Sequence, residues 1–204
     1  MLVFLFISIG FMLEVEADKE KMRKVAASYR DTQADLNEAL YETFQNDIAD
    51  WNATITKDNR IIFHAPDVLF ASSSSEIEPR FQRILKSFFP RFLAILRSKK
   101  FTDKIEGLQI EGYTSKTWAS ATSQQEIYLK NMQLSQQRAL AVLKFCYTIQ
   151  NKTVQSNRKW LEEKLRANGM AFAKKSDDKF SRRVEFKVNM RSEEKIFEIL
   201  KADK

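Results

Sequence analysis

The stretch NMQLSQQRA, residues 131–139, decides how this chain folds. It leads into a helical pattern that we predict from Leu134 to Gln150. We expect a long polar loop before it, from Thr114 to about Lys130. Arg138 lies within the predicted helix, where an arginine taken by itself is most often a solvated surface residue. A role for Arg138 therefore depends on the elements around it.

Strand and helix patterns on both sides of this stretch predict a mixed sheet. Asn52–Lys57 and Arg60–His64 flank Asp58-Asn59, and β-branched or alternating residues around a two-residue turn are typical of a β-hairpin. A helix opened by Pro79 and a strand at Gly107–Gly112 follow. The later elements are a helix at Ser156–Asn168, strands at Met170–Phe172 and Arg183–Val188, and a final helix at Ser192–Lys201. The βαβα(α)β order predicts an α+β fold, a sandwich of a mixed sheet with helices on one face.

The chain begins with an uncharged apolar run, MLVFLFISIGFML, from Met1 to Leu13. A span of about 13 residues is too short to cross a bilayer, which needs roughly 20. The run lacks the basic start and cleavage site of a signal peptide, and no cysteine follows it closely for lipid attachment. A buried amphipathic helix is an alternative, but the run is apolar on every face. We therefore expect the C-terminal half of a transmembrane helix whose beginning is missing from this sequence.

The next segment, Glu14–Trp51, is helical in composition and contains no Gly or Pro. Apolar residues recur along it at a spacing close to one helix face. We predict a rigid stalk, and it either packs on a second copy of itself or remains a single surface helix. The predicted divisions are a truncated transmembrane helix at 1–13, the stalk at 14–51, a globular domain at 52–190 and a helical tail at 191–204.

The composition argues against an enzyme and against binding of nucleic acid. The 204 residues carry a formal net charge of +7, spread over separate basic pairs as on a solvated surface. The sequence holds one cysteine, Cys146, and one histidine, His64. It contains no catalytic, metal-binding or nucleotide-binding motif. We therefore expect no enzymatic activity, no cofactor, no metal and no nucleic-acid partner.

Four separated pieces follow the pattern of one family. Residues 131–139 match N-x-x-LS-x-x-RA at every fixed position. Val68–Phe70 before a serine-rich loop, Ile110–Ser115 and Ser181–Phe186 are similar to the motifs LF-x-small, I-x-GHTD and NRRVEI. Over about Asn52 to Met190 these pieces resemble, in order, the OmpA/MotB-like C-terminal domain, a peptidoglycan-binding family.

The resemblance implies a site for the diaminopimelate of the peptidoglycan stem peptide. The planar guanidinium of Arg138 is suited to its carboxylate. Ser135 is expected at the start of a helix, where free backbone N–H groups and the helix dipole also favour an anion. The implied peptidoglycan-binding residues are Thr114, Ser115, Asn131, Leu134, Ser135, Arg138 and Arg182, with Phe70, Trp118 and Glu126 as accessory candidates.

The sequence departs from the family where the ligand's positive charge is balanced. Tyr113 replaces the family's histidine, and Ser115 replaces the aspartate that pairs with the ligand's ammonium. A serine offers only a hydrogen bond, which is weaker than a charged pair. Three alternatives are open: Glu126 in the long loop supplies the charge, the affinity is low, or the ligand differs. Trp118 either covers the pocket by stacking or anchors its loop.

A wall-binding domain on a stalk resembles the B subunits of ion-driven stators, of the MotB or ZorB type. The resemblance implies a homodimer that crosses the bacterial inner membrane once, holds its C-terminal domain in the periplasm and joins a multi-helix membrane stator partner. Its function would be a non-enzymatic anchor on peptidoglycan, for a motor or for anti-phage defence. The alternative, which Ser115 favours, is an interaction module that binds a protein partner. Met1–Leu13 contains no acidic residue, so an ion-carrying carboxylate would lie upstream.

Overall fold

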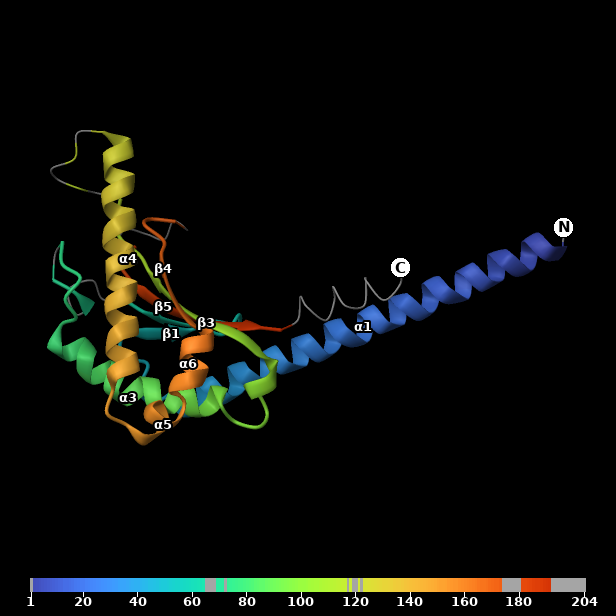
Figure 1. Ribbon diagram of the computed structural model, residues 1–204, viewed down its shortest axis with the longest axis horizontal. Helices are drawn as coiled ribbons and strands as arrows, with labels where there is room; N and C mark the ends of the chain where they lie inside the picture. The colour runs from blue at the N-terminus through green and yellow to red at the C-terminus, as the bar shows by residue number, and fades with distance from the viewer. Residues whose placement is uncertain are drawn as a thin grey trace.

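The computed structural model describes residues 2–64, 69–71, 73–116, 118, 121, 123–173 and 181–191. The helices are α1 (Leu2–Phe44), α3 (Pro79–Leu96), α4 (Gln124–Thr148), α5 (Lys152–Ser156) and α6 (Arg158–Lys164), with a short 3-10 helix at Thr102–Lys104. The strands are β1 (Ala53–Ile55), β2 (Arg60–Phe63), β3 (Ile105–Gly112), β4 (Leu165–Gly169) and β5 (Val184–Met190). Figure 1 shows that α1 projects from a domain built by the other elements. The predicted helix at Ser192–Lys201 falls outside the described residues.

The five strands form one mixed sheet in the order β1-β2-β5-β3-β4. β3 and β4 run parallel, and the other neighbouring pairs are antiparallel. The predicted hairpin is present as β1 and β2, and Asn59 in its turn has a φ of 58°, a conformation that asparagine tolerates better than most residues. Helices α3 and α4 supply their apolar side chains to one face of the sheet. The predicted α+β fold is therefore confirmed.

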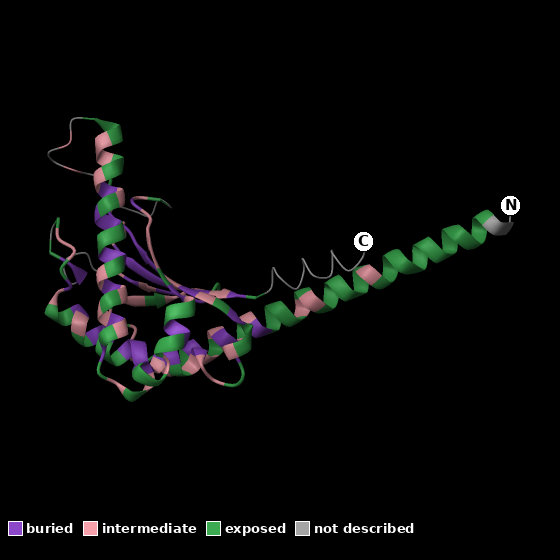
Figure 2. Cartoon of the chain, in the orientation of Figure 1, coloured by how far each residue is buried: buried purple, intermediate pink, exposed green. Residues whose placement is uncertain are grey.

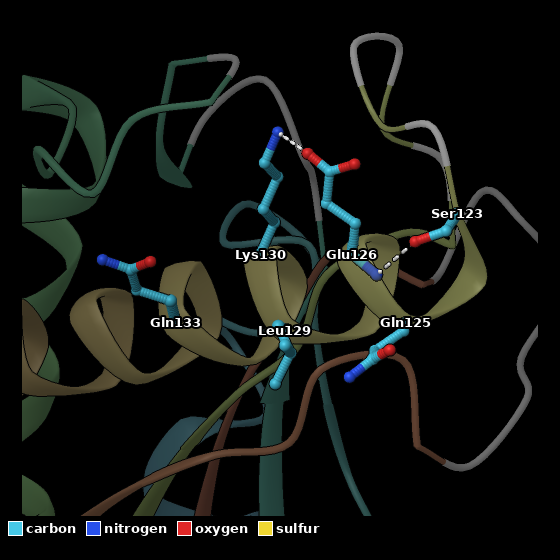
Figure 3. Close-up of a pocket in the computed structure, with 6 residues that line it drawn as sticks. All are labelled: Ser123, Gln125, Glu126, Leu129, Lys130 and Gln133. Carbon is cyan, nitrogen blue, oxygen red and sulfur yellow. Dashed lines mark hydrogen bonds and ion pairs between the residues drawn. The ribbon is translucent and has the colours of Figure 1, made fainter.

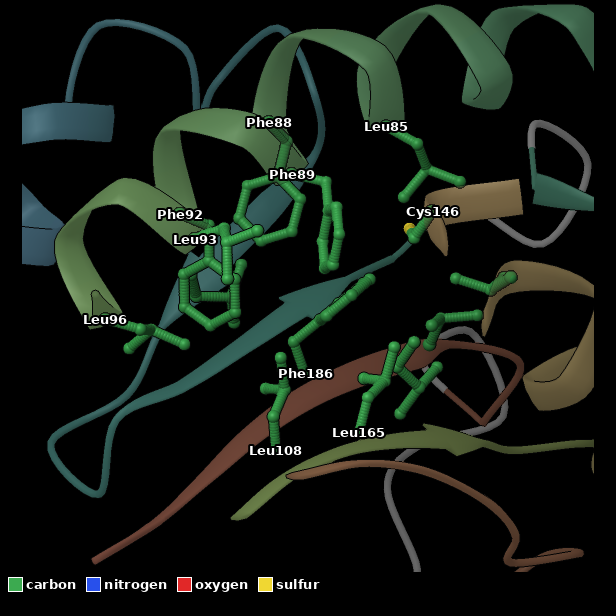
Figure 4. Close-up of a cluster of buried hydrophobic side chains, with 14 of the residues drawn as sticks. Leu85, Phe88, Phe89, Phe92, Leu93, Leu96, Leu108, Cys146, Leu165 and Phe186 are labelled. Atoms are coloured by element: carbon green, nitrogen blue, oxygen red, sulfur yellow. The ribbon is translucent and has the colours of Figure 1, made fainter. Parts of the chain in front are cut away.

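The apolar core lies between this sheet face and the helices. Buried residues recur at helical spacing along α3, including Phe88, Phe89 and Phe92. Phe186 of β5 reaches into this cluster, with its ring centroid 5.0 Å from that of Phe88, as Figure 4 shows. Cys146 of α4 is fully buried at the same core, and burial raises the pKa of its thiol. This cysteine is a packing residue, as its apolar sequence neighbours predicted.

The long helix α1 has two parts with different surroundings. Its last turns pack on the domain through Leu36, Leu40 and Phe44, which are all buried. The earlier turns project away from the domain and are exposed along most of their length (Figure 2). Large apolar side chains at the start of α1 are open to solvent, with Phe4 77% and Met12 73% exposed. In the part of the chain that the structure describes, no helix carries an apolar stretch long enough to cross a bilayer.

Helix α4 begins ten residues before the predicted start at Leu134. Ser123 is its N-cap, and the Ser123 hydroxyl accepts a hydrogen bond from the backbone N–H of Glu126. Serine followed three residues later by glutamate is a capping-box signature, and residues 124–130 are mostly good helix formers. The predicted loop at 114–130 is therefore wrong in its second half.

The predicted helix at Ser156–Asn168 is also wrong in its second half, because residues 165–169 form β4. This strand pairs with β3 in parallel, and the predicted strand at Met170–Phe172 is a turn. A β-carbon on Gly169 would lie 2.7 Å from the backbone nitrogen of Gln136, so glycine allows β4 to approach α4. Strand pairing and this packing outweigh the local helix propensity.

Candidate functional site

Arg138 of α4 has its guanidinium held against the loop that follows Phe70. Its Nε donates to the main-chain oxygen of Ser74 at 2.8 Å, and its Nη2 donates to that of Ala71 at 3.3 Å. The central carbon of the guanidinium lies 4.9 Å from the centroid of the Phe70 ring. The residue is only 5% exposed. Arg138 is therefore a fixed and buried cation, unlike a solvated surface arginine.

The surroundings of Arg138 favour an anion. Among the described residues no carboxylate forms an ion pair with it. Burial, together with the positive charge of Arg182, lowers the pKa of the Arg138 guanidinium to about 10. The group is still protonated at neutral pH, and a buried cation beside a second cation is stabilised by an incoming anion.

The end of β3 packs so closely on α4 that Thr114 comes to the side of the sheet where Arg138 lies. A β-carbon on Gly112 would lie 2.4 Å from the main-chain oxygen of Ser135, so only glycine allows this approach. Side chains alternate along extended backbone, so Thr114 shares the α4 side with Gly112. Thr114 is 2% exposed, and its Oγ1 has no hydrogen-bond partner within the described residues. This hydroxyl is available to a ligand.

Ser135, Asn131 and Leu134 are buried in this packing. Ser135 lies in the middle of α4, so the expectation of free N–H groups at a helix start is wrong there. The Ser135 hydroxyl accepts from the N–H of Ala171 and donates to the main-chain oxygen of Met132, both at 2.9 Å. These contacts fix α4 and the turn after β4. Direct contact of the three residues with a ligand stays a prediction.

Glu126 and Trp118 lie near the N-terminal end of α4. Figure 3 shows Glu126 in the first turn, where its Oε1 is 2.6 Å from the Nζ of Lys130. Glu126 precedes Arg138 by twelve residues in one helix, which is roughly 18 Å along the axis at about 1.5 Å per residue. The Lys130 Nζ is also 5.8 Å from the centroid of the Trp118 ring. A surface pocket at this end is lined by Ser123, Gln125, Glu126, Leu129, Lys130 and Gln133.

The structure thus brings part of the predicted site together at one end of the sheet. The residues that meet there are Phe70, Thr114, Arg138 and Arg182. Ser115 directly follows Thr114 and is half-buried. The main-chain oxygens of Ala71 and Ser74, which orient Arg138, were missed because no side-chain motif marks a carbonyl group. We call Phe70, Thr114, Arg138 and Arg182 the carboxylate site.

Comparison with known proteins places this geometry in a family. The model of the OmpA family matches residues 69–183, and the chain belongs to that family. Over 98% of its length the chain is 39% identical to the Zorya protein ZorB of Escherichia coli, and it covers 87% of that protein. The resemblance inferred from the four motifs is therefore confirmed.

Two solved structures are similar to this chain. One is the cell wall anchor of the T6SS from Pseudomonas aeruginosa, which is 21% identical with a TM-score of 0.50, over 74% of this chain and 97% of that one. The other is the periplasmic domain of Helicobacter pylori MotB, which is 17% identical with a TM-score of 0.46, again over 74% and 97%. Membership of the OmpA family and the relation to ZorB give this chain an anchoring role, and it is not an enzyme.

Proposed function

We propose that this chain anchors a stator-type complex of the inner membrane to the cell wall, by binding the peptidoglycan stem peptide at the carboxylate site. The observation that carries the proposal is the buried guanidinium of Arg138, which is oriented by two carbonyl groups and forms no ion pair with a described carboxylate. A buried charge without a counter-ion is costly, so the free energy of the empty site favours binding of an anion.

A carboxylate fits this site in shape and in charge. The guanidinium Nη1 of Arg138 makes no hydrogen bond to the described residues, so it remains for a ligand oxygen. Arg182 adds a second positive charge, and Thr114 adds a buried hydroxyl. Charge-assisted hydrogen bonds of this kind contribute about 1.5–3 kcal/mol each.

Recognition of the ligand's ammonium is the weaker half of the proposal. Ser115 carries no charge, and Glu126 pairs with Lys130 roughly 18 Å along α4 from Arg138. This position disfavours Glu126 as the replacement for the missing aspartate. We therefore expect the carboxylate to supply most of the binding free energy.

The membrane side of the proposal rests on α1. The apolar side chains from Phe4 to Leu13 are exposed, as a segment that sits in lipid requires. We propose that this segment lies in the bacterial inner membrane, with the domain in the periplasm and a multi-helix stator protein beside it. Val15, Met22 and Tyr29 are partly exposed at intervals of seven residues, which is the spacing of a helix that pairs with a second copy.

A second candidate function is the binding of a protein partner by the same fold. The observation that favours it is Ser115, because a site without the family's aspartate is poorer at holding a zwitterionic ligand. The two candidates differ in what the carboxylate site recognises, so they are separated by an assay on cell-wall material.

The direct test is co-sedimentation of the purified chain with isolated sacculi. We expect the wild type to bind and Arg138→Ala to bind about tenfold or more weakly, since one charge-assisted contact is worth at least about 1.4 kcal/mol. Arg158→Ala is the matched control, because Arg158 is exposed and contacts the ring of Tyr147 instead. Equal sedimentation of wild type and Arg138→Ala would favour the protein-partner function.

A further inference from the structure

A buried cluster of charged residues lies on the sheet face opposite α4. We call Arg60, Glu111, Tyr113, Arg183 and Glu185 the far-face network. Its centre is a pair of glutamates, because Glu111 and Glu185 lie directly opposite each other in the register of β3 and β5. They are 4% and 3% exposed. Like charges that face each other across two strands destabilise a sheet, so the pair requires compensation.

Three side chains provide that compensation. The Nη1 of Arg60 lies 2.9 Å from a carboxylate oxygen of Glu111 and 2.7 Å from one of Glu185. The Nε of Arg183 donates to Glu185 at 2.6 Å, and the hydroxyl of Tyr113 donates to Glu111 at 2.8 Å. Burial and the hydrogen bond to Glu111 raise the pKa of Tyr113, so its hydroxyl stays a donor at neutral pH. The network is thus closed around both carboxylates.

The network extends to the strand ends that carry the carboxylate site. The guanidinium carbon of Arg183 lies 3.6 Å from the centroid of the Tyr113 ring, and the backbone N–H of Tyr113 donates to the main-chain oxygen of Arg183. Tyr113 is followed by Thr114, and Arg183 is preceded by Arg182. Since side chains alternate, contacts of Tyr113 and Arg183 on one face fix the backbone that presents Thr114 and Arg182 on the other.

We infer that the far-face network positions the carboxylate site, with Tyr113 and Arg183 as positioning residues that hold Thr114 and Arg182 in place around Arg138. This inference rests on the proposed function for its ligand, but the geometry of the free protein tests it separately. A buried ionic network adds little net stability compared with apolar packing of the same shape. Its position at the strand ends that bear the site accords with a role in setting geometry.

The test compares Tyr113→Phe with Tyr147→Phe in the full chain. Both substitutions remove one phenolic hydroxyl that donates to a glutamate, to Glu111 in the first case and to Glu162 in the second. Three quantities are measured: sacculus binding, the midpoint of thermal unfolding, and the NMR signal of the Arg138 Nε–H in the free protein. We expect Tyr113→Phe to bind about fivefold more weakly and to shift the Arg138 signal, because a lost buried hydrogen bond is worth about 1 kcal/mol. Tyr147→Phe leaves both at the wild-type values.

Wild-type binding together with an unchanged Arg138 signal in Tyr113→Phe would overturn the inference, even if that variant unfolds at a lower temperature. Failure of the proposed function looks different, since the wild type would then bind sacculi no better than Arg138→Ala, and the NMR signal would still report on positioning. If Tyr113→Phe does not fold, Arg183→Lys replaces it, because lysine keeps the charge and loses the planar stack on Tyr113. The same signal shift is expected for that variant, and an unchanged signal would contradict the inference.

Discussion

The side-chain amide of Asn59 donates to the main-chain oxygen of Gln33 at 3.1 Å and to the side-chain oxygen of the same residue at 2.7 Å. The Asn59 oxygen accepts from the side chain of Asn37 at 3.1 Å, and Asn37 also donates to the main-chain oxygen of Thr56. Asn59 is fully buried. The hairpin turn is therefore joined to α1 by a closed set of hydrogen bonds.

The first prediction is that Asn59→Ala lowers the free energy of unfolding by about 3 kcal/mol. The substitution leaves buried polar groups of α1 and the turn without partners, and it places alanine at a φ of 58°. Asn59→Gly removes the same hydrogen bonds but tolerates that φ, so it is expected to be about 1 kcal/mol more stable than the alanine variant. Urea unfolding measures both, and an alanine variant within about 0.5 kcal/mol of wild type would contradict the account.

The second prediction concerns the contact between β3 and α4. Gly112→Ala is expected to lower the free energy of unfolding by about 2 kcal/mol or more, because its β-carbon would lie 2.4 Å from the main-chain oxygen of Ser135. Gly107→Ala on the same strand is the control, since its β-carbon would lie 3.6 Å from the nearest atom, at an ordinary contact distance. Equal unfolding midpoints for the two variants would mean that the packing at Gly112 is looser than described.

The third prediction separates the anchor from the protein-partner function. Ser115→Asp is expected to tighten sacculus binding about fivefold or more at low salt, because it restores a carboxylate for the ligand's ammonium. Ser115→Asn has nearly the same shape without the charge and is expected to bind as the wild type does. If the aspartate variant gains nothing over the asparagine variant, the protein-partner function is favoured.

The fourth prediction concerns the stalk. Met22→Cys is expected to form a disulfide-linked dimer under mild oxidation, because Met22 belongs to the stripe with Val15 and Tyr29 that we assign to self-pairing. Lys24→Cys, on the opposite side of the same helix, is expected to cross-link far less. Cys146 is buried and does not compete. Equal cross-linking of the two variants, measured by non-reducing electrophoresis, would indicate random collision of the chains.

Sequence patterns predicted the core helix α3, the hairpin and the α+β class because these depend on local spacing of apolar residues. Local signals failed where tertiary contacts decide. Residues 165–169 have a helical composition, yet pairing with β3 makes them a strand. The early start of α4 had a sequence signal, the Ser123–Glu126 capping box, which the polar composition of the segment concealed.

For the site, the motif at residues 131–139 predicted Arg138 but not its surroundings. The main-chain oxygens of Ala71 and Ser74 come from a distant loop and leave no mark in the sequence. The far-face network was also missed, since the register that places Glu111 opposite Glu185 depends on how β3 and β5 pair. Pattern reasoning therefore found the charge that binds, while the groups that hold it depend on long-range contacts.

The central claim is that Arg138 binds a carboxylate of the peptidoglycan stem peptide. Calorimetric titration of the full chain with a purified muropeptide that ends in diaminopimelate tests it most directly. The account predicts measurable binding by the wild type, and a dissociation constant that is about tenfold or more higher for Arg138→Ala while the Arg158→Ala control is unchanged. The same dissociation constant for wild type and Arg138→Ala would contradict it.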